Sequence, residues 1–240
     1  MAKTYRNLFP QVYSFQNLLA AFHRARRGRA GREYVAEFEF FLEGNLLQLE
    51  EELRTETYRP GGYRSFYIYE PKKRLVSAAP FRDRVVHHAL VGVLEPIWEA
   101  RFIHDSYACR RGKGIHQAVD RAHALVRNYC YALKGDVVKF FPSVDYDILL
   151  GLLARHVADP PVLRLAARIL ESGAGVLDGE VEPAWFPGDD LFSPLRPKGL
   201  PIGNLTSQFW ANVYLNELDQ FVKRELGPRL PALCRRCSAL

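Results

Sequence analysis

Apolar positions recur at helical spacing through most of the first hundred residues. Ser14 and Gly28 bracket one such stretch, which predicts a helix capped by the serine and ended by the glycine. Residues 34–54 and 81–100 repeat apolar side chains every three to four positions and predict two further helices. The amino-terminal half is therefore expected to be rich in helix.

Other stretches carry the period of a strand or the residues of a loop. Residues 63–69 alternate aromatic and polar side chains, and residues 131–141 are rich in β-forming types, so each predicts a strand. Pro142 and Ser143 then introduce a helix whose first-turn acids complement its amino-terminal end. Residues 171–200 are rich in Gly, Pro and Asp and predict a long loop or insertion.

Composition narrows the class of protein. The chain has 240 residues, of which 48% are hydrophobic, which excludes a disordered tail, a collagen-like fibre and a coiled coil. A net charge of +6 suits a polyanionic partner, although an ordinary basic enzyme fits equally well. Cys234 and Cys237 have no second pair to complete a zinc site. We expect a cytoplasmic protein, because no apolar stretch has membrane-spanning length and no signal-peptide region opens the sequence.

One acid stands out at the end of the second predicted strand. Asp136 follows a buried-looking stretch, and a buried carboxylate is costly unless it is paired or holds a metal ion. Two-metal sites hold Mg²⁺ on carboxylates for displacement at phosphorus, and Phe141 would lie beside an incoming sugar. The alternative is an ion-paired acid with core phenylalanines, and this stretch alone favours that alternative.

Four stretches together change that balance. They are EPKKRLVSAAPFRDRVVHHAL (70–90), FIHDSYACRRGKGIHQAV (102–119), YALKGDVVKFFPSVDYDIL (131–149) and GLPIGNLTSQFWANVYLNELD (199–219). In this order they resemble the reverse transcriptases of group II introns, retrons and diversity-generating retroelements. The resemblance implies an α+β right-hand polymerase with palm strands packed on helices. It implies a division into N-terminal helices and fingers (1–125), a partial palm (126–226) and an aberrant tail (227–240).

The resemblance also implies residue roles. Asp136 would be the first metal-binding aspartate, and the backbone carbonyl of Val137 would help to hold the same ion. Phe141 would exclude a 2′-hydroxyl, and Lys73 and Arg74 would grip the triphosphate. The complete family site holds two Mg²⁺ ions; this chain would hold at most one, weakly. The implied reaction adds deoxynucleotides to a primer 3′-hydroxyl on an RNA template.

The turn at 202–208 indicates a subtype. Most relatives have Gln-Gly-x-x-x-Ser-Pro, whereas this chain has Ile202, Gly203 and Gln208, the pattern of diversity-generating retroelement enzymes. There the three residues lie near the incoming base pair, and the change from Gln to Ile implies error-prone copying. The alternatives are a helix entry with Ile202 in the core and, within the family, an enzyme of the group II intron or retron type.

The implied partners are an RNA template, a primer, deoxynucleoside triphosphates and a small basic accessory protein. Template or phosphate contacts are expected at four arginines, for which structural ion pairs are the alternative: Arg82, Arg84, Arg110 and Arg111. A second group crowds the end of the first helix and either complements the helix dipole or contacts phosphates: Arg24, Arg26, Arg27, Arg29 and Arg32.

The family's Tyr-x-Asp-Asp box and thumb are absent from the 240 residues. Gly188-Asp189-Asp190 resembles a polymerase acid box but precedes the Gly203 turn, so we interpret it as an acidic loop. Codons for residues 230–236, shifted by one nucleotide, can encode a Tyr-x-Asp-Asp sequence, which suggests a frame change near residues 227–230. We expect little polymerase activity. A non-catalytic RNA-binding remnant, or neutral decay without function, stays open.

Overall fold

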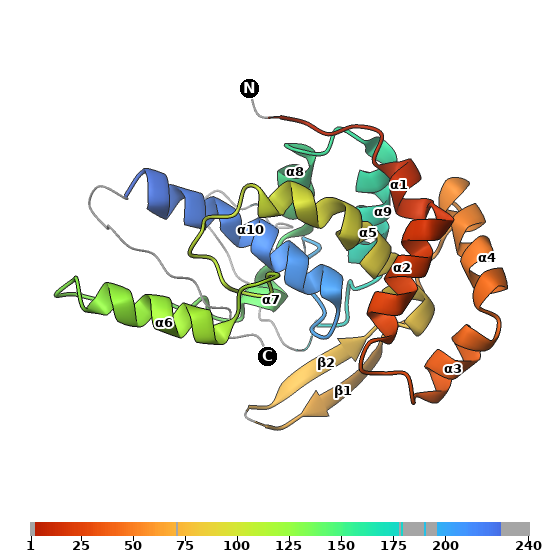
Figure 1. Ribbon diagram of the computed structural model, residues 1–240, viewed down its shortest axis with the longest axis horizontal. Coiled ribbons are helices and arrows are strands. Elements are labelled where there is room, and N and C mark those ends of the chain that lie inside the picture. Colours follow the sequence, from red (N-terminus) through yellow and green to blue (C-terminus); the bar gives the residue numbers. More distant parts are fainter. Residues whose placement is uncertain (1–2, 71, 178, 180–189, 191–195, 227–240) are drawn as a thin grey trace.

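The structure is a computed structural model of the chain, and it describes residues 3–70, 72–177, 179, 190 and 196–226. Helices dominate this part of the chain, with a two-stranded sheet at one side (Figure 1). The elements in chain order are α1 (Phe9–Tyr13), α2 (Phe15–Arg26), α3 (Glu33–Phe40), α4 (Leu42–Arg54), β1 (Arg64–Ile68), β2 (Arg74–Ala78), α5 (Phe81–Glu99), α6 (Ile115–Val126), α7 (Phe140–Ser143), α8 (Tyr146–Ala154), α9 (Pro160–Glu171) and α10 (Leu205–Arg224).

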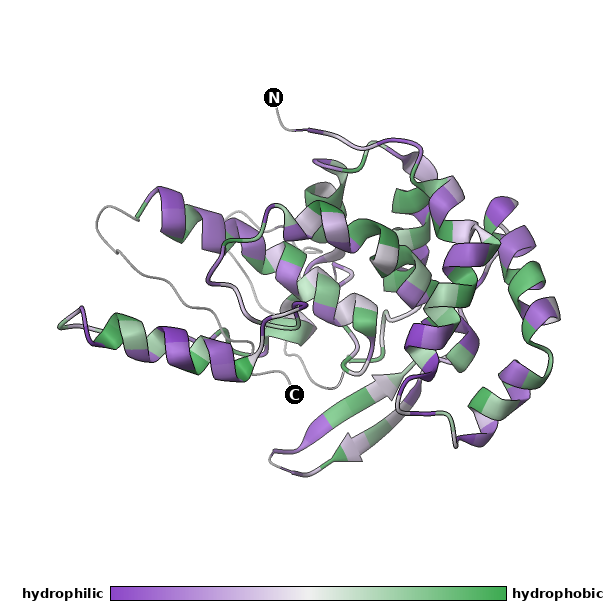
Figure 2. Ribbon diagram, viewed as in Figure 1, coloured by the Kyte–Doolittle hydropathy of each residue, from purple (hydrophilic) through white to green (hydrophobic). Residues whose placement is uncertain are grey.

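Helix α5 is the element around which the others pack. It contacts α2 and α10 most extensively and also touches α1 and α3. Its side chains are buried on several sides, as a helix with so much apolar surface requires. Figure 2 shows hydrophobic positions on α5, α8, α9 and α10, and many of their buried side chains belong to one cluster. Trp98 of α5 packs edge-to-face on Phe209 of α10, with ring centroids 5.7 Å apart, which joins the two halves of the chain in one core.

The first predicted helix is confirmed at both ends. Helix α2 begins after Ser14, whose hydroxyl accepts a hydrogen bond from the Asn17 backbone N–H at 3.4 Å. It ends at Arg26, two residues before Gly28, which has the left-handed φ of +74°.

The single helix predicted over residues 34–54 is wrong. The chain bends at Phe41, whose φ and ψ are −112° and 35°, and forms α3 and α4 instead. The Asn45 side chain donates a hydrogen bond to the Phe38 carbonyl across the bend, at 3.0 Å. The bend lets α3 pack on α5 while α4 packs on α1 and α2. Packing on two different surfaces therefore outweighs the continuous helical spacing of apolar residues over 34–54.

The strand predicted near residues 63–69 is confirmed as β1, and the structure adds a partner that the sequence did not reveal. Strands β1 and β2 form an antiparallel hairpin in which Arg64 pairs with Ala78 and Ile68 with Arg74. Every residue of β1 is exposed, so the hairpin projects from the helices (Figure 1).

The strand predicted over residues 131–141 is also wrong. Residues 131–139 have no regular secondary structure and are all exposed, and Phe140 begins the short helix α7. Strand propensity reflects how well a side chain fits a pleated surface between neighbours. No strand within the described residues pairs with this segment, so nothing supplies its ladder hydrogen bonds.

The remaining predictions fare better. Helix α8 follows Pro142 and Ser143, and the Asp145 side chain caps it by accepting a hydrogen bond from the Ile148 N–H at 3.0 Å. The fold is mixed and rich in helix with a small sheet, as the α+β class requires at this coarse level. No described helix combines the length and the apolar character needed to cross a membrane.

Candidate functional site

The β-hairpin is fastened to the turn that precedes α10. The Ser77 N–H donates a hydrogen bond to the Ile202 carbonyl at 2.8 Å. The buried side chain of Asn204 completes the joint, because its Oδ1 accepts from the Ala79 N–H at 3.1 Å and its Nδ2 donates to the Ser77 carbonyl at 2.8 Å. Two stretches more than 120 residues apart in sequence are thereby held edge to edge.

Gly203 makes this close approach possible. Its φ is +112°, a conformation that strains any residue with a side chain. A Cβ at this position would lie 2.8 Å from Cγ1 of Val76 on β2, which is too close for any real contact. A glycine is therefore required by both the backbone and the packing, as expected for a turn against which another element rests.

Phe141 contacts the chain just before the same turn, at Leu200. Its side chain is 8% exposed, and its carbonyl accepts a hydrogen bond from the Leu200 N–H at 2.8 Å. The Tyr146 hydroxyl donates to the Gly199 carbonyl at 2.7 Å. The structure thus brings together three predicted features: the hairpin, Phe141 and the 202–203 turn. Gln208 lies one turn into α10 and is half-buried.

Lys73 and Arg74 lie at the outer end of this hairpin. The Lys73 ammonium is 4.5 Å from the centre of the Tyr67 ring, and the side chain is exposed. Arg74 is half-buried and opens β2 opposite Ile68. Ser77, which is fastened to the turn, follows Arg74 by three residues, about 10 Å at the rise of a strand. Both cations therefore project beyond the joint.

Asp136 makes no hydrogen bond or ion pair with the residues of this joint. The residue is exposed, as is Val137, and Asp136 forms no hydrogen bond or ion pair with another described residue. Nowhere in the described ranges do three or more His, Cys, Asp or Glu side chains stand where they could hold a metal ion. Since two Mg²⁺ ions need several carboxylates, the described residues do not fit the complete metal site, and no chemical step is derived through it.

The four arginines expected to contact RNA lie in different surroundings. Arg82 forms an ion pair with Glu52 and stacks over Tyr58. Arg110 is nearly buried and binds Glu99 at 2.7 Å. Arg84 donates to the Ala79 carbonyl at 2.8 Å, while Arg111 is exposed. Ion pairs thus engage two of the four, Arg82 and Arg110. Contacts of all four arginines with RNA stay predictions.

A buried carboxylate that the sequence did not single out supports the base of the hairpin. Asp83 accepts hydrogen bonds from the Tyr58 hydroxyl at 2.7 Å and from the Gly61 N–H at 2.8 Å. Burial, followed by the charge of Asp83, raises the pKa of Tyr58, so this phenol stays protonated as the donor. Asp83 lies in the first turn of α5, where an acid suits the helix dipole, but its partners are set by tertiary contact.

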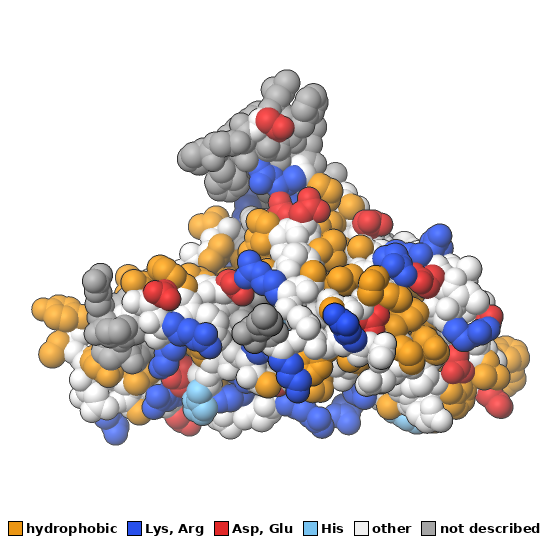
Figure 3. Space-filling view, turned by 90° about the horizontal axis from the view of Figure 1, so that it is seen from above, with side chains coloured by type: hydrophobic (Ala, Val, Ile, Leu, Met, Phe, Trp, Pro, Cys, Tyr) orange, Lys and Arg blue, Asp and Glu red, His pale blue; other side chains and the backbone are white. Residues whose placement is uncertain are grey.

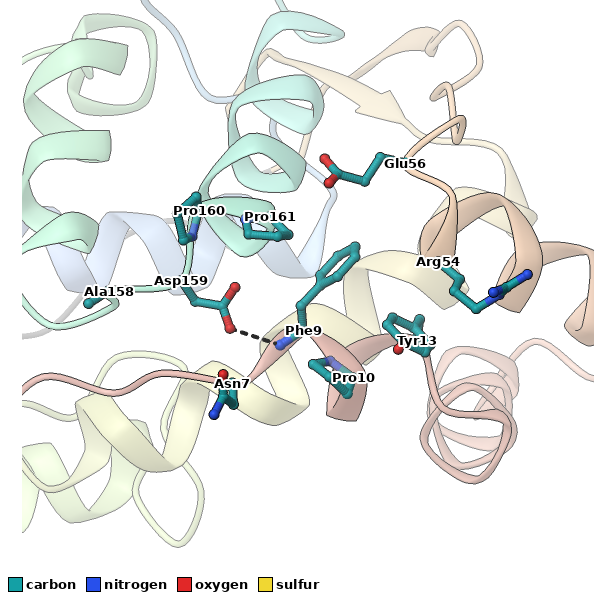
Figure 4. A pocket seen from close by; sticks show the side chains of 10 residues that line it. All are labelled: Asn7, Phe9, Pro10, Tyr13, Arg54, Glu56, Ala158, Asp159, Pro160 and Pro161. Atoms are coloured by element: carbon teal, nitrogen blue, oxygen red, sulfur yellow. Dashed lines mark hydrogen bonds between the residues drawn. The ribbon is translucent and has the colours of Figure 1, made fainter.

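A pocket of about 400 Å³ lies away from this joint, where α1 meets the end of α4 and the α8–α9 connection (Figure 4). Its walls are largely aromatic rings and prolines, among them Phe9, Tyr13 and Pro161. Its acid Asp159 accepts from the backbone N–H groups of Leu8 and Phe9 at 2.6 and 3.1 Å and so holds the start of α1. Glu56 is engaged by Arg164, so the pocket's acids serve structure.

The Cys234–Cys237 pair, the possible frame change and residues 188–189 of the acid-box look-alike lie outside the described residues. Several known proteins are similar to the chain in sequence, and some of them are intron-encoded proteins or intron maturases. No family model matches the chain. It is 27% identical over 182 residues to protein YkfC of Escherichia coli, covering 72% of this chain and 44% of that protein. It is 28% identical over 185 residues to the mitochondrial nuclear intron maturase 1 of Arabidopsis thaliana, covering 61% and 26%.

It is also 26% identical over 185 residues to the group II intron-encoded protein LtrA of Lactococcus lactis, covering 76% of this chain and 29% of LtrA. The chain thus spans less than half the length of each of these relatives. Among solved structures, a chain of a partial Cas6-RT-Cas1–Cas2 complex superposes with a TM-score of 0.51 at 21% identity, over 90% of this chain and 35% of that one. This likeness concerns the fold alone.

Proposed function

We propose that this chain, a homologue of group II intron-encoded proteins and intron maturases, forms the fingers and part of the palm of an RNA-directed DNA polymerase. The complete enzyme would add deoxynucleotides to a primer 3′-hydroxyl along an RNA template. The observation that supports the proposal most is the joint between hairpin and turn, because it gathers three separately predicted features around one place. The homologues supply independent support for the family.

In this proposal the hairpin carries the triphosphate contacts. Lys73 offers a point charge and Arg74 a planar fork of donors, and together they suit an anion with several oxygens. Phe141 would limit the space beside the sugar. Ile202, Gly203 and Gln208 would border the incoming base pair, where Gly203 already allows the backbone an unusually close approach to β2.

The diversity-generating subtype is proposed on Ile202 and Gln208 alone. The relatives found are of the group II intron type, which makes an intron-type enzyme the second candidate. Fidelity separates the two in a catalytically complete form of the enzyme. With Ile202 we expect frequent errors opposite template adenines, and Ile202→Gln should reduce them; equal error rates in both forms would favour the intron-type enzyme.

A polypeptide of these 240 residues is proposed to have little polymerase activity. Asp136 is one carboxylate where the reaction requires several, and it would hold at most one Mg²⁺ ion weakly. Primer extension with purified 1–240 should give no more product than the Asp136→Asn variant; robust Mg²⁺-dependent synthesis that depends on Asp136 would contradict this.

The nucleotide sequence after codon 226 tests the proposed frame change, because the overlapping frame should then encode Tyr-x-Asp-Asp.

Binding of triphosphate tests the proposal in the chain as it stands. We expect a deoxynucleoside triphosphate to bind 1–240 and Lys73→Gln/Arg74→Gln to lose most of that affinity, since charged hydrogen bonds contribute about 1.5–3 kcal/mol each. The control Arg155→Gln removes one exposed arginine that already pairs with Glu217. RNA binding without triphosphate binding would favour the RNA-binding remnant. The RNA template, the primer and a small basic accessory protein are the further partners proposed.

A further inference from the structure

We propose that Arg24, Arg29, Arg84 and Arg111 form a binding track for the phosphate backbone of single-stranded RNA along one face of α5. The track deepens the proposed function, because it adds an RNA-contacting surface apart from the hairpin. Of the four, only Arg84 touches the joint between hairpin and turn, where it donates a hydrogen bond to the Ala79 carbonyl.

The track follows a stripe on α5. Arg84, His88, Gly92 and Glu95 are spaced by three or four residues and therefore lie on one side of the helix. At about 1.5 Å per residue the stripe is about 17 Å long, enough for several nucleotides. Several Lys and Arg side chains lie along the lower edge of the view in Figure 3. This edge is the side of the molecule that faces the viewer in Figure 1.

Arg24 of α2 is held across the middle of this stripe. Its Nη2 donates a hydrogen bond to the His88 carbonyl at 3.2 Å. A Cβ built on Gly92 would lie 2.8 Å from the same Nη2, so the guanidinium lies against the bare backbone of the glycine. Gly92 thus provides a seat for Arg24, and Glu95 on the same stripe acts on this cation through its charge without forming an ion pair with it.

Ion pairing separates these four arginines from their neighbours. Arg26 is bound by Glu39, Arg82 by Glu52 and Arg110 by Glu99. In the described part of the chain, by contrast, no carboxylate lies within 4.0 Å of a nitrogen of the four track arginines, and ion pairs account for none of them. Glu95 offsets part of the charge of Arg24 and Arg111, and the remaining positive charge is available to an anion.

The titration of two half-buried groups on the same stripe, His88 and Glu95, agrees with this arrangement. Burial, followed by the charges of Arg24, Arg29 and Arg84, lowers the pKa of His88 to about 4. Burial raises the pKa of Glu95, the acid at the far end of the stripe, although Arg111 and Arg24 oppose that shift. The local field is therefore positive, with one acid at its end.

An aromatic ring at the start of the track favours single-stranded RNA over other anions. Tyr34 of α3 is 41% exposed, and the Arg84 guanidinium lies 5.7 Å from its ring centre. Cations that follow a backbone, with exposed rings on which bases stack, are the usual means of binding single strands without sequence preference.

Salt dependence tests the track directly. A 20-nucleotide single-stranded RNA is titrated with 1–240 over a range of salt concentrations, without Mg²⁺ or triphosphate. Arg24→Gln/Arg111→Gln should reduce the slope of log affinity against log salt by about 1.4, since each phosphate contact to a single strand contributes about 0.7. The control Arg155→Gln/Arg164→Gln removes the same charge from two exposed ion pairs and should leave the slope unchanged. Equal slopes for the two double variants would overturn the track.

Gly92→Ala provides a second variant that keeps every charge. The new methyl group displaces the Arg24 guanidinium, so the slope should fall by about 0.7, while the helix itself gains propensity. An unchanged slope in Gly92→Ala would contradict the seat. Vesicles with anionic lipid form the last arm: binding to them that depends on Arg24 and exceeds binding to RNA would overturn the assignment to RNA. Triphosphate binding at Lys73 and Arg74 is measured separately, so the proposed function can stand if the track fails.

Discussion

Two regions of this chain differ in how many packing and hydrogen-bond partners they find within the chain: the region around α5 and the hairpin, and residues 115–139. Around α5, apolar side chains meet from both halves of the sequence, and the hairpin is fastened to the Gly203 turn by buried hydrogen bonds. In the arm, residues 115–139, Ala118 is the one buried residue of α6 and lies outside that core, and residues 131–139 are all exposed. The predicted nucleotide contacts lie in the first region and the predicted metal ligand in the second.

The difference shows that strand propensity is not sufficient without neighbours. Residues 131–138 include Val137 and Val138, yet Val138 is 83% exposed because no strand in the described part of the chain covers it. The hairpin is equally exposed along β1, but β2 gives it a ladder and the Ile202 carbonyl anchors one end. A segment at the surface holds its conformation where its backbone groups find partners.

The sharpest test of this contrast lies in the core. Phe22 is fully buried and packs on Phe38 and Phe81. Phe22→Ala should lower the free energy of unfolding by about 3–5 kcal/mol, because it removes apolar burial and leaves a cavity. Urea denaturation followed by circular dichroism measures the change. A loss below about 1 kcal/mol would mean that α2 is not packed on α5 as described.

The joint comes next. Asn204→Ala leaves the buried Ala79 N–H and Ser77 carbonyl without their side-chain partner, which should cost about 2–4 kcal/mol of unfolding free energy. The matched control is Ser65→Ala, which removes the hydroxyl contact to Ser77 on the exposed hairpin and should cost much less. Similar losses in both variants would show that Asn204 does not fasten the hairpin.

Gly203→Ala tests the same joint through sterics. The left-handed φ and the overlap with Val76 should together cost about 1–3 kcal/mol. Shortening the opposing side chain with Val76→Ala should return part of that loss but leave the backbone strain. A double-mutant cycle in urea measures the coupling; additive effects would show that Gly203 and Val76 do not touch.

The core should also respond to pH. Burial lowers the pKa of His87 to about 3, whereas in the unfolded chain the value is about 6.5. Between these values the unfolded state binds a proton that the folded state does not, so stability is complete above pH 6.5 and falls as the pH drops. His87→Leu should flatten the dependence by up to about 1.4 kcal/mol per pH unit. The free energy of unfolding of both proteins, measured from pH 7 to pH 4, tests this prediction. The same pH dependence in His87→Leu and in the unchanged protein would contradict the burial of His87.

The smallest effect is expected in the arm. Leu133 is 93% exposed, so Leu133→Ala should change the free energy of unfolding by no more than about 0.5 kcal/mol. The comparison with Phe22→Ala under the same conditions gives the contrast in a single experiment. A loss comparable with that of a core residue would show that residues 131–139 are packed.

Sequence patterns predicted the elements that depend on local signals. Ser14 and Gly28 marked the ends of α2, and the aromatic alternation after Tyr63 marked β1. The bend at Phe41 escaped prediction because the apolar period runs through it without interruption. Strand β2 escaped because RLVSA is short and lies between charged residues and Pro80.

The candidate site was predictable in part. The resemblance named Lys73, Phe141 and Ile202, and the structure brings the hairpin, Phe141 and the turn together. Local patterns could not reveal the roles of Asn204 and Gly92, since both depend on contacts with residues more than 60 positions away. Asp136 was misjudged as a strand-end acid because its β-forming neighbours gave no information about partner strands.

The central claim is that the region with the predicted nucleotide contacts is fastened by buried hydrogen bonds, while the segment that carries Asp136 is not. Hydrogen exchange of backbone amides tests it most directly. The amides of Ser77 and Ala79, which donate to the Ile202 carbonyl and to Asn204, should be strongly protected, and those of residues 131–139 should exchange almost as fast as an unfolded chain. Equal protection in both segments, or fast exchange at Ser77 and Ala79, would contradict the claim.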